Sequence, residues 1–311
     1  MASSDGVISL QPRLAGVAGF LDRFLLPLVL AAAGLGAAFP APGRLLDANG
    51  AILITLAVLV FCTGSSVTFA DMGGMRAAAG RMALVLAVTT VTLPVLAWLA
   101  SRLVSGAALQ GGVLAAGVAP AEVASVALTG MAGGEVVVAA GLLVASTLLT
   151  VLLAGPILAL LGAHTAVSQL GLLSTLALVV ALPLIAGCAM RTLDPFGGRE
   201  RPLIEILGIA SLLVLLWEIS SELRLHASDG RIAVALLVFL AGAGVLGWLL
   251  ARGAPPGQRT AVLLPTTMRD FAVAAGIAAS AFGIAAAAPL GIYGVMVLVF
   301  GAITVYMSKR A

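Results

Sequence analysis

Charged side chains are scarce in this sequence. Aspartate, glutamate, lysine and arginine together make up 9% of the 311 residues, whereas 61% are hydrophobic and the mean hydropathy is +1.19. A soluble globular domain of ordinary composition has about 25% charged residues. So few charges cannot cover the surface of a water-soluble fold of this length. The composition therefore excludes a disordered chain and leaves no segment for a soluble catalytic or sensory domain.

Clusters of basic residues, cysteines and histidines are also lacking. The formal net charge is only +3 and the basic residues are scattered, so the sequence predicts no nucleic-acid partner. The two histidines and two cysteines form no metal-binding pattern, and no cofactor is indicated. Cys62 and Cys188 both lie in apolar runs, which predicts buried thiols that act as small hydrophobic side chains.

Long apolar runs dominate the sequence. The bilayer core is about 30 Å thick and needs roughly 20 apolar residues per helix. The runs lack the polar–apolar alternation of barrel strands, so we predict an all-α polytopic protein in the lipid bilayer. Its ten transmembrane helices are expected at about 24–40, 50–69, 81–103, 109–131, 136–161, 169–190, 202–222, 231–251, 260–282 and 287–307.

Basic residues in the loops predict the orientation. Cytoplasmic loops are enriched in lysine and arginine. With both termini in the cytoplasm, eleven basic residues fall on the cytoplasmic side and four on the other. We therefore expect an inner-membrane protein with residues 1–21 as a retained cytoplasmic tail. The eleven are Arg13, Arg23, Arg76, Arg81, Arg191, Arg199, Arg201, Arg252, Arg259, Lys309 and Arg310, and the four are Arg44, Arg102, Arg224 and Arg231.

Two of the ten predicted spans contain proline together with charged residues. The fourth has Pro120 and Glu122 near its middle, and the ninth has Pro265, Arg269 and Asp270. Proline kinks or breaks a helix, and matched interruptions in two halves are typical of inverted-repeat transporters. We therefore predict one five-helix repeat over 22–163 and a second, inverted one over 164–311. The alternative is that both prolines are ordinary kinks, which transmembrane helices tolerate.

The charges within these spans need partners, water or a function. An ionised group at the bilayer centre costs at least about 2.5–3.5 kcal/mol on insertion scales. If the two broken helices cross, Glu122 approaches Arg269 and Asp270, and a Glu122–Arg269 pair lowers the cost of both. The set is either a substrate or ion site or a salt bridge that only locks the helices. Four hydroxyl side chains lie beside the same breaks: Ser125, Thr129, Thr266 and Thr267.

Five segments of the chain, in order, resemble motifs of the bile acid:sodium symporter family. They are FCTGSSVTFADMGG (61–74), TTVTLPVLAWLA (89–100), APAEVASVALTGMAGGEVVVA (119–139), LPLIAGCAMR (182–191) and TTMRDFAVAAGIAASAFG (266–283). The resemblance implies a panel domain of helices one, two, six and seven and a core domain of the other six. It also implies a crevice for an organic anion beside two crossing, broken helices, with alternating access by movement of core against panel.

The positions at which this family binds sodium differ in this sequence. The resemblance places sodium ligands at Ser125-Val126, Ala139, Leu143, the neighbourhood of Pro265, Arg269-Asp270 and Thr89. Hard cations prefer several oxygen ligands, and apolar side chains offer none. A guanidinium at such a site would repel a cation. The resemblance therefore supports the fold, whereas the residues argue against sodium as a co-substrate.

These observations predict a secondary transporter of a small organic anion, with Arg269 attracting the anion. Proton coupling through Asp270 or Glu122, or no coupling, fits the residues better than sodium coupling. A sodium-coupled symporter of bile-acid-like anions is the alternative mechanism. An intramembrane enzyme is the alternative from another class, but the nucleophile–base or metal set that it needs is absent from the sequence. The protein is therefore not expected to be an enzyme.

Overall fold

Regular structure in the described part of the protein is entirely helical. The computed structural model describes residues 4–47, 50–66, 68, 78–163, 168–221 and 229–308. Six helices in these ranges are long and apolar enough to cross a membrane. Five of them are α6 (Ala79–Ser101), α9 (Val136–Leu160), α12 (Arg201–Ser221), α13 (Asp229–Arg252) and α16 (Ala288–Ser308), the last preceded by a 3-10 turn (Ile284–Ala287). The sixth runs through α10 (Gln169–Leu176), a π-helical turn (Ala177–Ala181) and α11 (Leu182–Leu193).

Shorter helices fill the other four predicted spans. The first contains α2 (Leu25–Ala38), which is followed by α3 (Pro40–Asp47), and the second contains α4 (Ala51–Gly64). The fourth and ninth are each divided in two, giving α7 (Ala107–Val118) with α8 (Ala124–Met131), and α14 (Pro256–Thr267) with α15 (Phe271–Phe282). The all-helical membrane class is therefore confirmed, while the inverted repeat of ten crossings stays a prediction.

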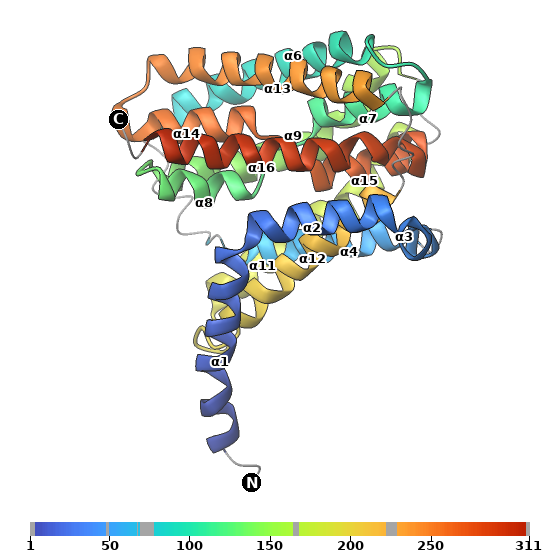
Figure 1. Cartoon of the computed structure of the whole chain (residues 1–311). Coiled ribbons are helices and arrows are strands. Elements are labelled where there is room, and N and C mark those ends of the chain that lie inside the picture. The colour runs from blue at the N-terminus through green and yellow to red at the C-terminus, as the bar shows by residue number, and fades with distance from the viewer. Residues whose placement is uncertain are drawn as a thin grey trace.

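The helices form two groups (Figure 1). The upper group contains α6, α7, α8, α9, α13, α14, α15 and α16. The lower group contains α2, α3, α4, α11 and α12, which pack against one another, with α10 leading into α11. From this lower group α1 (Ser4–Arg23) extends at a steep angle to α2 (Figure 1).

Glycines bring two helices of the lower group into backbone contact. A Cβ atom at Gly64 of α4 would collide with the carbonyl of Leu184, and one at Gly187 of α11 would collide with the carbonyl of Phe61. Small residues at such contacts let transmembrane helices approach closely, which favours van der Waals packing. Many large apolar side chains are exposed on the outer surface, as expected for contact with lipid; Leu160, for example, is 87% exposed.

Several sequence predictions concern single residues. Cys62 and Cys188 are free and buried, as predicted. Residues 67 and 69–74 of the motif at 61–74 lie outside the described residues. So do four of the basic residues used for orientation: Arg76, Arg224, Lys309 and Arg310.

Candidate functional site

The first helix break separates α7 from α8. Ala119 is extended, with a ψ angle of 155°, because a proline ring disfavours helical backbone in the residue before it. Pro120 itself has no N–H to donate to the helix. Helical structure therefore stops at Val118 and resumes at Ala124.

The second break separates α14 from α15 and contains no proline. Pro265 lies inside α14, which continues to Thr267, so the prediction that Pro265 marks the break is wrong. A transmembrane helix tolerates the single hydrogen bond that a proline removes. Met268 and Asp270 are extended, and Asp270 caps α15 by accepting a hydrogen bond from the amide of Val273 at 2.8 Å. Such an N-cap defines where the second half-helix begins.

The two breaks pair with each other as a short antiparallel bridge. The amide of Glu122 donates to the carbonyl of Met268 at 2.8 Å, and the amide of Asp270 donates to the carbonyl of Pro120 at 2.9 Å. Ala121 lies opposite Arg269 in this bridge. Backbone groups in the bilayer core have no water to bind, and leaving them unpaired is costly. Each break therefore satisfies part of the backbone of the other.

Two hydroxyls of α9 satisfy further backbone groups of the first break. Ser146 accepts a hydrogen bond from the amide of Ala121 at 3.0 Å, and Thr150 donates to the carbonyl of Val118 at 3.0 Å. Neither contact is among the sequence predictions. Only their spacing in the sequence indicates these contacts: Ser146 and Thr150 are four residues apart and therefore share one face of an apolar helix.

Tyr293 of α16 serves the second break. Its hydroxyl accepts a hydrogen bond from the amide of Arg269 at 3.2 Å, and its ring packs on Phe239 with centroids 5.8 Å apart. Tyrosine hydroxyls that are buried usually have such a partner. Tyr293 is also missing from the sequence predictions, although it is one of only two tyrosines in the chain.

Glu122 lies at the N-terminal ends of two half-helices. Its carboxylate accepts long hydrogen bonds from the amide of Ala124 at 3.5 Å and from the amide of Phe271 at 3.4 Å. These are the first residues of α8 and α15. Helix N-termini carry positive partial charge. The two helix ends therefore stabilise this carboxylate, which is only 4% exposed.

Arg269 does not form the expected pair with Glu122. Within the described ranges, no carboxylate lies within 4.0 Å of its guanidinium. The guanidinium donates instead to the carbonyl of Ala119, at the C-terminal, partially negative end of α7. The prediction failed because successive side chains of an extended segment point to opposite faces. Arg269 shares a face with Ala121, and Glu122 points to the other.

The four hydroxyl residues beside the breaks have different partners. Ser125 donates to the carbonyl of Glu122 at 2.5 Å, and Thr129 donates to the carbonyl of Ser125 at 2.7 Å. Thr267 donates to a carbonyl one turn earlier in α14, at 2.8 Å. Such bonds to the local backbone use up the hydroxyl proton. Thr266 differs, because its hydroxyl is buried and has no hydrogen-bond partner among the described residues.

A crevice of about 440 Å³ lies between the upper and lower groups. Of the predicted site residues, all of which are described, Glu122 is the one that lines it. Its wall is largely apolar and includes Leu25, Leu59, Leu212 and Leu298. Near the turn between α11 and α12, it is lined by charged residues of both signs: Arg191, Glu200, Arg201 and Glu205.

Arg269 lines two small cavities inside the upper group instead. They measure about 20 Å³ and about 10 Å³, and Thr89 of α6 and Ser146 of α9 line both. Cavities of this size have room for about one water molecule. The paired breaks therefore present a carboxylate to the crevice and a guanidinium to the interior of the upper group.

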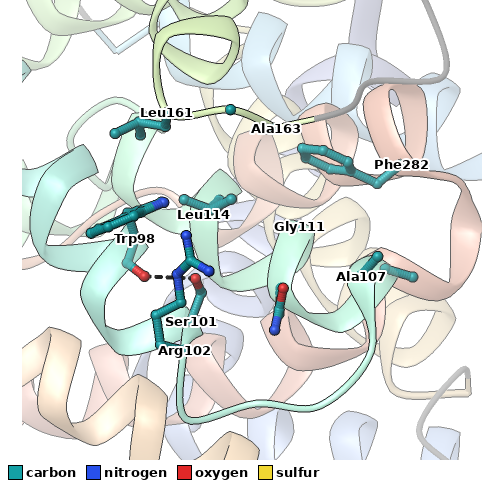
Figure 2. Close-up of a pocket in the computed structure, with 12 residues that line it drawn as sticks. Trp98, Ser101, Arg102, Ala107, Gly111, Leu114, Leu161, Ala163 and Phe282 are labelled. Atoms are coloured by element: carbon teal, nitrogen blue, oxygen red, sulfur yellow. Dashed lines mark hydrogen bonds between the residues drawn. The ribbon is translucent and has the colours of Figure 1, made fainter.

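A further cavity, of about 350 Å³, lies where the C-terminal ends of α6, α9 and α15 meet α7. Figure 2 shows Arg102 beside Trp98 at its edge and Phe282 across from them; the guanidinium carbon of Arg102 lies 4.4 Å from the indole centroid. The polar groups of Ser101 and Gln110 bond to nearby carbonyls. None of the residues predicted for the site lines this cavity.

Long apolar helices and buried, mutually paired helix breaks define a multi-pass membrane protein with the features of a transporter. The chain belongs to the Sodium Bile acid symporter family, whose model matches residues 53–228, more than half of the chain. The resemblance seen in the sequence motifs is therefore confirmed. No curated protein matches the chain. The family match contains the first break but ends before α14, so the second break is known from the structure.

Proposed function

We propose that this protein is a secondary transporter of small organic anions. The observation that carries the proposal is the crevice of about 440 Å³ between the two helix groups, which reaches the paired breaks at Glu122. Its apolar wall suits the body of an amphipathic anion, and Arg191 and Arg201 offer positive charge for the anionic group. In this proposal Arg191 and Arg201 attract the anion. Arg269, for which the sequence predicts that role, lines two other cavities and faces away from the crevice.

The proposed mechanism is alternating access. The lower group acts as the panel and the upper group as the core, and movement between them opens the crevice to one membrane face and then the other. Two inverted repeats, 22–163 and 164–311, each supply one broken helix. The crevice is lined by Arg191 and Arg201 at the α11–α12 turn, which the distribution of basic residues assigns to the cytoplasm. In this proposal both termini are cytoplasmic, with residues 1–21 as a tail.

We further propose that sodium does not drive this transport. Val126 of α8 packs against an apolar cluster that contains Ala139 of α9. These are positions at which the family resemblance places sodium ligands, and apolar side chains supply no oxygen. The geometry favours proton coupling through Glu122 rather than through Asp270. Glu122 lines the crevice, whereas the carboxylate of Asp270 caps α15. The sodium-coupled symporter remains the alternative, supported by the family itself.

The test combines binding and transport. A set of organic anions is screened for thermal stabilisation of the purified protein in sodium and in potassium buffer. The best stabiliser is then measured for uptake into proteoliposomes under an imposed sodium gradient and under an imposed proton gradient. We expect stabilisation in both buffers and no stimulation by sodium. Strong stimulation by sodium alone would favour the alternative mechanism.

Two variants, each with one alanine replaced by tryptophan, test whether the crevice is the substrate site. Ala127 of α8 is exposed and lines the crevice, whereas Ala159 of α9 is exposed but lines none of the described cavities. Ala127→Trp should fill the crevice and abolish both stabilisation and uptake. Ala159→Trp should leave both unchanged. Equal activity of the two variants would contradict the crevice as the substrate site.

A further inference from the structure

The guanidinium of Arg269 is a positively charged group in the interior of the upper group of helices. Arg269 is 6% exposed, and it shares one cavity with Thr89 of α6, Val118 of α7 and Ser146 of α9. A buried arginine usually pairs with a carboxylate. For Arg269, no described carboxylate is within ion-pair distance. The adjacent Asp270 carboxylate acts on it from farther away, so other groups must contribute to offsetting its charge.

The end of α7 supplies part of that offset. The guanidinium donates to the carbonyl of Ala119, the C-cap residue of α7, where the helix has negative partial charge. Its Nε atom has no hydrogen-bond partner among the described residues. The guanidinium is therefore held by its charge and one carbonyl rather than by a complete set of hydrogen bonds.

The same space has a second buried polar atom without a partner. Thr266 is 1% exposed, its hydroxyl has no hydrogen-bond partner within the described ranges, and it lines the smaller cavity together with Arg269 and Ser146. Thr89 and Ser146 line both small cavities with Arg269, Thr266 lines the smaller one, and the carbonyl of Ala119 accepts a hydrogen bond from the guanidinium. The oxygen atoms that these four residues offer are neutral. Neutral oxygens beside a helix C-terminus are a suitable environment for a monovalent cation.

Charges of opposite sign are thus sorted between the two faces of the bridge. On the face of the bridge opposite Arg269, the carboxylate of Glu122 lies at the N-terminal ends of α8 and α15, and that of Asp270 caps α15. On the inner face, the guanidinium lies at the C-terminal end of α7. Each of these side chains faces helix ends of the opposite sign.

We propose that the space around the guanidinium of Arg269 is a monovalent-cation site that the protein fills with its own side chain. While Arg269 is in place, the paired breaks need no external cation to stabilise them, and the site is closed to sodium. Without the side chain, the site should accept free guanidinium or a small alkali cation. This inference extends the proposal that transport is independent of sodium. The cation site itself does not depend on that proposal, and only its consequence for ion coupling rests on it.

The test uses thermal unfolding of the purified full-length protein in detergent, without any organic anion. Arg269→Ala should lower the melting temperature by roughly 5–10 °C, because it removes a buried charge and leaves its partners unpaired. Millimolar guanidinium chloride, at constant ionic strength, should restore at least half of that loss, and sodium chloride should restore more than choline chloride does. The wild-type protein should show none of these effects.

Two further substitutions separate charge from hydrogen bonding. Arg269→Lys keeps the charge and should stay closer to wild type than Arg269→Gln, which keeps a donor but removes the charge. The glutamine variant should be stabilised by sodium. These two variants also keep the test decisive if Arg269→Ala does not fold.

Arg102 provides the matched control. It is exposed and stacks on Trp98, so Arg102→Ala should show no rescue by guanidinium. If Arg269→Ala matches wild type in stability, or if added cations affect wild type and variants equally, the cation site does not exist. If guanidinium restores the melting temperature of Arg269→Ala but the wild-type protein transports no organic anion, the cation site is supported and the proposed transport function is wrong.

Discussion

The two helix breaks reach one geometry by different means. Pro120 creates the first break, because it removes a backbone donor and forces Ala119 out of the helix. The second break has no proline and is defined by Asp270, which caps the next half-helix. The second break therefore has a side-chain cap at the start of its second half-helix, whereas α8 begins without one after the proline of the first break.

The breaks also differ in the charge that they contribute. The first contributes Glu122 to the crevice, and the second contributes Arg269 to the interior of the upper group. The alternation of side chains along a two-stranded bridge separates them, although they come from paired segments. Two paired breaks can therefore contribute opposite charges to different places, one to the crevice and one to the interior of the upper group.

The largest expected effect concerns the crevice face. Glu122→Gln should reduce the uptake rate by about 10- to 100-fold, as expected when a charged hydrogen-bonding group worth about 1.5–3 kcal/mol is removed. The variant should also lose any dependence of uptake on a proton gradient. The measurement is initial uptake into proteoliposomes at several pH values.

The control for Glu122 is Glu205, another glutamate that lines the crevice but is exposed. Glu205→Gln makes the same change of charge and should leave uptake within about twofold, since exposed charges contribute little. If both variants lose uptake equally, the position of Glu122 at the breaks has no special role.

The next prediction compares the side chains that support each break. Ser146→Ala leaves the amide of Ala121 without its partner, and Tyr293→Phe does the same to the amide of Arg269. Each loss of a single oxygen should cost about 1–3 kcal/mol of stability, because a buried donor is left unsatisfied. Chemical unfolding in detergent measures both, with the exposed Ser174→Ala as control. A cost for only one of them would show that the two breaks are not equally constrained.

The sequence predicts the helical class and the approximate places of both breaks. Apolar runs and a proline beside a charge are local signals, and they locate Pro120, Glu122, Arg269 and Asp270 correctly near the breaks. Pro265 misleads because a transmembrane helix tolerates one missing hydrogen bond. At Pro120, by contrast, the bridge and the hydroxyls of α9 satisfy the backbone groups that the break exposes.

The partners of the charges could not be predicted in the same way. The pairing of Ala121 with Arg269 is a tertiary contact, and it alone decides that Arg269 and Glu122 point to opposite faces. Ser146 and Tyr293 lie in apolar helices far along the chain, so their roles depend on helix packing. Sequence reasoning therefore identifies the charged residues of the site but not the geometry of their contacts.

The smallest expected effect tests how the second break differs from the first. Asp270 accepts a hydrogen bond from the amide of Val273 as the N-cap of α15. Asp270→Ala should lower the free energy of unfolding by about 0.5–2 kcal/mol, the usual cost of losing such a cap. Asp270→Asn should cost much less, since asparagine caps helices about as well as aspartate does. Uptake should survive in the asparagine variant, unlike in Glu122→Gln. If Asp270→Asn instead loses uptake while its unfolding curve matches wild type, the carboxylate acts in transport, and the two breaks share that task.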